Sequence, residues 1–307
     1  MPDVKILGSG LGFPEGPVWM ADGSVILGEI SGSKVTRVAP DGSKTEIGKA
    51  GGGPNGVATG PDGALYVCNN GGAVYETTPS FLSTGPAPDY RGGSIQRIDP
   101  KTGETKTLYS EVNGHKLSAP NDIVFDRQGG FYFTDLGKRF AHHRDNGGLY
   151  YALPDGSKII ELVYPIITPN GVGLSPDEKT VYVADTETSR LYAWDIVSPG
   201  KVKHDPFPAP YGGRCVCGLP GFQRFDSLVR NIRQPLHRHS PRATFHPRQR
   251  VRSKQLRPGC RGDLARSLQT FSVQRAAGNH QRGARTGAQQ RRGPLHILIR
   301  WQRGLRH

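Results

Sequence analysis

Apolar and polar positions alternate with a period of two along the first three quarters of the chain, in short runs that end at Gly-rich turns. Such a run, a tight turn and a second alternating run together predict a β-hairpin. The pattern is clearest in four segments that share one beginning: Pro, then Glu or Asn, then usually Gly. The four segments are FPEGPVWMADGSVILGEI from Phe13, GPNGVATGPDGALYVCNN from Gly53, APNDIVFDRQGGFYFTDL from Ala119 and TPNGVGLSPDEKTVYVAD from Thr168.

A second predicted strand pair follows each hairpin and again turns at Pro-Asp-Gly or a similar cluster. Each unit therefore holds four strands, and the units begin at Pro14, Pro54, Pro120 and Pro169. Four-stranded units repeated at such intervals predict an all-β protein built as a β-propeller. Residues 1–228 would form about four blades and part of a fifth. The alternative is a sandwich or a string of unrelated hairpins.

A polar residue recurs at the start of each unit. The first strand of a propeller blade lines the central channel, so this residue should form a ring at one channel mouth. Carboxylate and amide oxygens of this kind suit a hard divalent cation. The alternative is structural, because Asn and Asp are common in turns and tolerate left-handed backbone. The position holds Glu15, Asn55, Asn121 and Asn170, and a fifth match in the segment RFDSL supplies Asp226.

The motifs at these residues resemble a known family. FPEGPVW, PNDIVFD, PNGVGLSPDEKTVYVAD and RFDSL are similar to the gluconolactonase/regucalcin (senescence marker protein) family of six-bladed β-propeller lactonases, over about residues 8–228. The resemblance implies a channel-mouth divalent cation held by Glu15, Asn170 and Asp226. Ca²⁺ is the first choice, and Zn²⁺, Mg²⁺ and Mn²⁺ are alternatives.

The implied reaction is metal-dependent hydrolysis of a small, sugar-type lactone, with Asp226 as the catalytic base. Some family members carry an arginine that holds the sugar where this chain has Ala119, so that contact is not expected here. A non-catalytic propeller that binds calcium or a partner is the alternative function.

The resemblance also implies residues that meet the substrate. Asn121 would contact substrate or metal-bound water, and Asp122 would support it. Asn55 lies on the ring and is a further candidate, or only a turn residue. Arg139 belongs to the loop 138–143, which we interpret as a solvated loop; the alternative is that the loop reaches the mouth and Arg139 binds an anionic substrate.

The sequence changes character after Leu228. Residues 229–307 contain 19 of the 40 Lys and Arg residues, one of the 26 acidic residues and no tyrosine. The basic charge of the chain therefore belongs to this segment. A nucleic-acid-binding arm or a natural disordered extension would fit the composition, but the change falls inside the fifth repeat and not at a linker. We therefore favour a shift of reading frame just after Leu228, which would leave the propeller incomplete and its activity impaired.

Other expectations follow from what the sequence lacks. Nothing near the N-terminus resembles a signal peptide, and no run of about 18 apolar residues suggests a membrane span. The four cysteines are too few and too unevenly spaced for a disulfide scaffold. We expect a cytoplasmic protein with a small-molecule lactone as its partner, no specific nucleic acid and no membrane. The sequence leaves the oligomeric state open.

Overall fold

A computed structural model describes residues 3–75, 83–218 and 296–301 of the chain. The described residues form antiparallel β-sheets, and the first three four-stranded sheets follow the repeats in order. Blade 1 consists of β2 (Pro14–Trp19), β3 (Val25–Glu29), β4 (Lys34–Val38) and β5 (Lys44–Lys49). Blade 2 consists of β6 (Pro54–Thr59), β7 (Leu65–Asn69), β10 (Ser94–Ile98) and β11 (Thr105–Tyr109). Blade 3 consists of β14 (Pro120–Phe125), β15 (Phe131–Asp135), β16 (Gly147–Ala152) and β17 (Ile159–Ile166).

Blade 4 ends differently from the others. It contains β18 (Pro169–Leu174), β19 (Thr180–Asp185) and β20 (Arg190–Ser198), and both β21 (Lys201–Val202) and β22 (Arg214–Gly218) pair with β20. A short 3-10 turn, Pro210–Gly212, precedes β22. The fifth repeat, with Asp226, lies outside the described residues.

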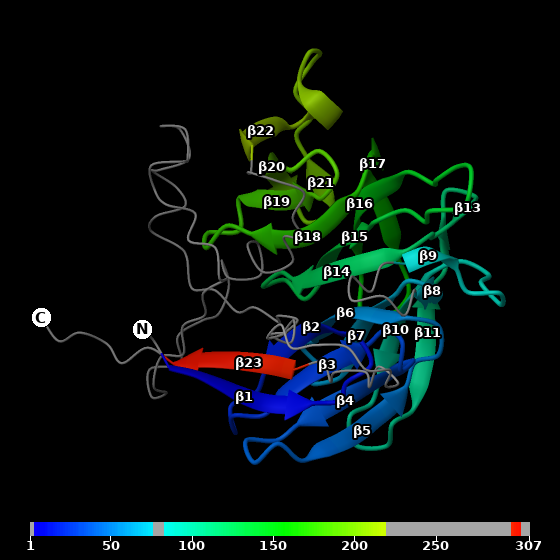
Figure 1. Ribbon diagram of the computed structural model, residues 1–307. Helices are drawn as coiled ribbons and strands as arrows, with labels where there is room; N and C mark the ends of the chain where they lie inside the picture. The colour runs from blue at the N-terminus through cyan, green and yellow to red at the C-terminus, as the bar shows by residue number, and fades with distance from the viewer. Residues whose placement is uncertain (1–2, 76–82, 219–295, 302–307) are drawn as a thin grey trace, which may run out of the picture.

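Three two-stranded pairs lie beside the blades. These are β8 (Ala73–Tyr75) with β9 (Ser83–Pro86), β12 (Glu111–Val112) with β13 (His115–Lys116), and β1 (Asp3–Ser9) with β23 (His296–Trp301). The last pair joins the two ends of the described chain, as Figure 1 shows. Strand β23 lies in the range that the sequence predicts to be low in order.

The first strands of the blades contact one another in chain order, β2 with β6, β6 with β14, and β14 with β18. In Figure 1 they lie toward the middle of the molecule, while β5, β11 and β17 lie outside. This is the arrangement of β-propeller blades around a channel, and it confirms the predicted fold class.

Two glycines explain how the inner strands come so close. A Cβ atom on Gly16 would lie 2.2 Å from the carbonyl oxygen of Asn55, and one on Gly56 would lie 2.5 Å from that of Asn121. No larger residue fits between the blades at these positions. In blades 1 and 2 the Gly that follows Glu or Asn is therefore required by packing.

Apolar side chains between neighbouring sheets form the core. Phe131 and Ile95 belong to a cluster between blades 2 and 3, and Trp194 and Leu149 belong to one between blades 3 and 4. These four side chains are fully buried. Burial of such side chains is the main force that holds the blades face to face.

Candidate functional site at the channel mouth

The start of the first strand and the end of the second strand lie at the same edge of every blade. The register pairs are Pro14 with Glu29, Pro54 with Asn69, Pro120 with Asp135, and Pro169 with Asp185. Immediately after the Pro or the residue that follows it, the pairing shifts by one residue in all four blades. A bulge of this kind redirects side chains at a strand end.

Two sets of polar residues therefore surround the mouth. We call the residues that follow the prolines the channel ring, and those opposite the prolines the cap ring. The channel ring is Glu15, Asn55, Asn121 and Asn170, and the cap ring is Glu29, Asn69, Asp135 and Asp185.

The channel ring brings the predicted site residues together on adjacent inner strands. Asn55, Asn121 and Asn170 are buried, and Glu15 is half-buried. The side-chain oxygen of Asn170 is buried and has no hydrogen-bond partner among the described residues. Its backbone oxygen, in contrast, accepts a hydrogen bond from the Thr134 hydroxyl of blade 3. The strand is thus held by its backbone while the Asn170 side chain keeps an unused acceptor.

Asp122 joins two blades. It is 1% exposed, and its two carboxylate oxygens accept the backbone N–H groups of Ile123, at 2.9 Å, and of Val172 in blade 4, at 3.0 Å. Blade 3 has Asp where the other repeats have Gly, and this carboxylate spans the contact with the next inner strand. Its role beside a substrate stays a prediction.

The remaining predicted residues lie apart. Arg139 is exposed in the loop after β15, where its backbone forms an isolated bridge to Arg144. Asp226 lies outside the described residues, so its place relative to the ring stays a prediction.

The sequence analysis missed the cap ring, whose oxygens hold the loops that enter the inner strands. Asp135 accepts backbone N–H groups from Ser118 at 2.6 Å, Ala119 at 2.7 Å and Gly137 at 2.9 Å. Burial raises the pKa of Asp135, and these N–H groups act against that rise.

The other cap-ring residues act in the same way. Asn69 accepts from the N–H groups of Gly53 and Gly71, both at 2.9 Å. Glu29 accepts from the N–H of Gly12 at 2.5 Å. The signal was visible, because Glu, Asn, Asp and Asp occupy the corresponding place near the end of the four aligned segments.

Lys138 supplies a buried positive charge next to the cap ring. It is 6% exposed, so the interpretation of its loop as solvated is wrong for this residue. Its ammonium donates to the carbonyl oxygens of Asn70 at 2.6 Å and Gly72 at 2.9 Å, and lies 4.7 Å from the ring centre of Tyr90. Burial lowers the pKa of Lys138 to about 8, against the opposing effect of the Asp135 carboxylate. The Lys138 ammonium thus connects the loop after β15 in blade 3 to the loop after β7 in blade 2.

The side chains of the channel ring offer oxygen atoms as possible metal ligands. Among the described residues, no three His, Cys, Asp or Glu side chains gather into a potential metal site. Three of the four channel-ring positions are Asn, so a cation there would be bound by amide oxygens together with Glu15. The part of the chain that the structure describes also contains no helix long and apolar enough to cross a membrane.

Comparison with known proteins agrees with the fold. Over 203 residues the chain is 34% identical to a protein named lactonase drp35 from Staphylococcus saprophyticus, covering 64% of this chain and 56% of that protein. It is 25% identical over 213 residues to a gluconolactonase of Zymomonas mobilis, covering 62% of this chain and 54% of the relative. The chain thus spans little more than half the length of these relatives.

A solved structure shares the fold. A gluconolactonase of Xanthomonas campestris aligns with a TM-score of 0.54 at 24% identity, covering 71% of this chain and 66% of that one. Residues 13–209 match the family described as the SMP-30/gluconolactonase/LRE-like region. This segment contains the channel ring and the described blades up to β21, and the chain belongs to that family.

Proposed function

We propose that the channel mouth hydrolyses a small, sugar-type lactone with the help of one divalent cation, Ca²⁺ as the first choice. Glu15, Asn170 and Asp226 would hold the cation. The similarity to proteins named lactonase and gluconolactonase supports the reaction class. The oxygen donors at the mouth support a hard cation.

The unpartnered oxygen of Asn170 carries the proposal. Burying an amide group without a hydrogen bond costs about 1–3 kcal/mol, so such an atom calls for a ligand. Two other buried oxygens, in the Thr186 and Thr188 hydroxyls, also lack a partner among the described residues. Both lie in the loop after β19, whereas Asn170 lies on the inner strand and on the ring.

A bound cation would polarise the lactone carbonyl and lower the pKa of a bound water. The residues of the chain would do the rest. The amides of Asn55 and Asn121 would orient the lactone oxygens by hydrogen bonds. The carboxylate of Asp226 would take the proton of the attacking water as general base. Asp122 would keep the inner strand of blade 3 in register with that of blade 4, and Arg139 would attract the carboxylate product at the rim.

We further propose that the change of sequence after Leu228 weakens this activity. Residues 229–307 lack the repeat that would build the remaining blades, so nothing in them replaces the neighbours that Asp226 would need. The nucleotide sequence around codon 228 tests this. If neither alternative frame encodes further blade repeats, the frame-shift hypothesis is wrong.

The experiment measures hydrolysis of glucono-δ-lactone by the full chain with a pH indicator, with Ca²⁺ and after chelation. We expect the rate to fall to background after chelation and about 100-fold in Asp226→Ala and Glu15→Gln, the scale of a general base or cation ligand. Glu104→Gln, at an exposed turn, is the matched control and should keep the wild-type rate. Hydrolysis that survives both chelation and Asp226→Ala would rule out this site. Calcium binding without hydrolysis would favour the non-catalytic alternative.

A further inference from the structure

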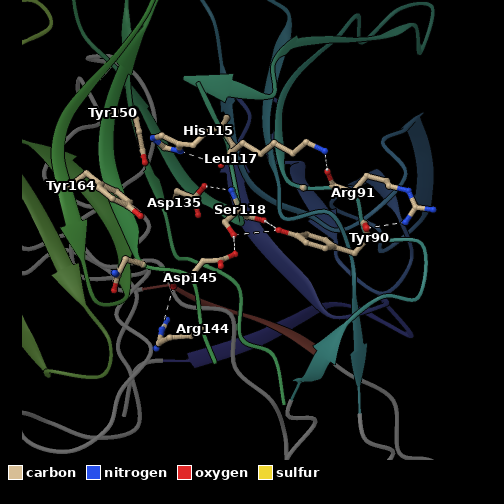
Figure 2. A pocket seen from close by; sticks show the side chains of 13 residues that line it. Tyr90, Arg91, His115, Leu117, Ser118, Asp135, Arg144, Asp145, Tyr150 and Tyr164 are labelled. Carbon is tan, nitrogen blue, oxygen red and sulfur yellow. Dashed lines mark hydrogen bonds between the residues drawn. The ribbon is translucent and has the colours of Figure 1, made fainter. Parts of the chain in front are cut away.

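A second cleft borders the channel mouth at blade 3, where Asp135 of the cap ring lines it. It has a volume of about 590 Å³ and lies between the loops that precede β10 and β14 on one side and strands β16 and β17 on the other. Figure 2 shows its lining, which includes Tyr90, His115, Ser118, Asp145, Tyr150 and Tyr164. None of the channel-ring residues lines it. A ligand here would lie beside the mouth but would not contact the channel ring.

One side of the cleft offers hydrogen-bond acceptors. The Asp145 carboxylate is half-buried, and one of its oxygens accepts from the Ser118 hydroxyl. Its other oxygen makes no hydrogen bond to any side chain or backbone group in the described part of the chain. The neighbouring Arg144 does not neutralise it, because that guanidinium pairs with Glu187 at 2.6 Å. Asp145 therefore keeps an acceptor for a ligand.

The opposite side offers phenol donors and an aromatic surface. Tyr164, on the outermost strand of blade 3, is 47% exposed, and its ring centre lies 5.4 Å from that of His115. Its hydroxyl has no hydrogen bond to another described residue. In Figure 2 the hydroxyl ends of Tyr150 and Tyr164 point toward the Asp135 and Asp145 side.

Two phenols of the cleft remain protonated at physiological pH. Burial raises the pKa of Tyr90 to about 12 and also raises the pKa of Tyr150. Both are therefore neutral groups; the Tyr90 hydroxyl already donates to the carbonyl oxygen of Ser118 at 2.8 Å and offers a ligand only an acceptor.

The basic side chains around the cleft already make contacts within the protein. His115 Nε2 lies 2.8 Å from the Glu161 carboxylate, and the Lys116 ammonium donates to the carbonyl oxygen of Arg91 at 3.2 Å. The two lining cations without a carboxylate partner, Arg91 and Lys116, are exposed and each donates to a carbonyl oxygen, so no buried cation in the described part of the chain lines the cleft to bind a phosphate. Among the described residues, no three His, Cys, Asp or Glu side chains gather to enclose a metal ion. What remains is a carboxylate acceptor, phenol groups and a half-exposed aromatic face.

That combination matches a sugar ring. Each sugar hydroxyl can donate to a carboxylate and accept from a phenol, and the apolar C–H face of the ring can pack on an aromatic side chain. We propose that this cleft binds the ring of a neutral saccharide, with Asp145 accepting its hydroxyls and Tyr164 covering its apolar face. The proposal does not depend on lactone hydrolysis.

The test is a titration of the full chain with methyl β-D-glucopyranoside, followed by saturation-transfer NMR. We expect saturable binding by the wild type. Asp145→Asn should weaken it about tenfold, the scale of a hydrogen bond to a charged group. Tyr164→Ala should abolish the signal, and Tyr164→Phe should retain part of it because the ring remains.

Two variants control for unspecific effects. Asp155→Asn makes the same change at a turn outside the cleft, and Phe207→Ala removes an aromatic side chain that is 97% exposed. Both should bind the sugar as the wild type does. Asn170→Ala should also bind it normally, so failure of the lactonase proposal would not count against this one. The absence of saturable binding, or binding unchanged in both Asp145→Asn and Tyr164→Ala, would overturn the proposal.

Discussion

The two polar rings at the channel mouth are built from the same residue types on paired strands, yet they use their oxygens in different ways. In the cap ring, Asn69 is 4% exposed, and its amide group makes hydrogen bonds to the loop backbone on both its oxygen and its nitrogen. In the channel ring, Asn170 is 5% exposed, and its amide oxygen has no partner among the described residues. Equal burial and equal chemistry therefore do not imply equal roles.

The difference teaches how to separate structural from functional polar residues in a repeat. Both rings recur in every described blade, so recurrence alone does not distinguish them. A buried polar side chain with all its partners present stabilises the fold, whereas one without partners lowers stability unless a ligand supplies them. Substitutions in the two rings should consequently differ most in the free energy of unfolding.

The largest effect is expected at Asp135. In Asp135→Ala two buried backbone N–H groups and one partly buried N–H group lose their acceptor, and Lys138 loses a nearby counter-charge. We expect a loss of about 3–5 kcal/mol in the free energy of unfolding, measured by urea titration at pH 7.

A matched control for Asp135 is Asp99→Ala. Asp99 also accepts two backbone N–H groups, from Lys101 and Thr102, but at an exposed turn. Water can replace the lost acceptor there, so the loss in the free energy of unfolding should be much smaller than in Asp135→Ala. An equal loss in the free energy of unfolding of the two variants would show that burial does not strengthen the contribution of Asp135 to stability.

A smaller effect concerns the charge beside the cap ring. The pKa of Lys138 is lowered by burial from 10.5 to about 8, so between these values the unfolded chain holds a proton that the folded protein has released. The free energy of unfolding should then rise with pH in this window, because the unfolded state binds more protons. Relative to Lys138→Met, the wild type should gain about 2 kcal/mol between pH 8 and pH 10.

Urea titrations of both proteins at pH 8, 9 and 10 measure this gain. Taking the difference cancels the titration of the tyrosines. If the difference in the free energy of unfolding between the two proteins stays constant with pH, the carbonyl oxygens of Asn70 and Gly72 keep Lys138 ionised. The prediction that burial lowers the pKa of Lys138 would then be wrong.

Much of the fold could be predicted because local chemistry dictates it. Turn sequences such as Asp22-Gly23 predicted the hairpins. Strands β2 and β3 form a hairpin in the first aligned segment, as the pattern predicted. The channel ring followed from one repeated position. The role of Asp122 could not be predicted, because its partner Val172 is 50 residues away and meets it only after the blades pack. Lys138 was misjudged for the same reason, since its acceptors belong to another blade.

The smallest effect on stability, and the sharpest contrast, is expected at Asn170. In metal-free buffer Asn170→Ala removes an oxygen that has no partner, so the free energy of unfolding should change by less than about 1 kcal/mol. Asn69→Ala, the same substitution at equal burial, removes hydrogen bonds to Gly53 and Gly71 and should cost about 2–4 kcal/mol.

Ca²⁺ at about 100 times its dissociation constant should then stabilise the wild type and Asn69→Ala by about 2.7 kcal/mol. Ca²⁺ should not change the free energy of unfolding of Asn170→Ala, because that variant lacks the amide oxygen that would bind the cation. Calcium stabilising Asn170→Ala as much as the wild type would mean that the unpartnered oxygen is not a cation ligand, and equal destabilisation of the two alanine variants would remove the distinction between the rings.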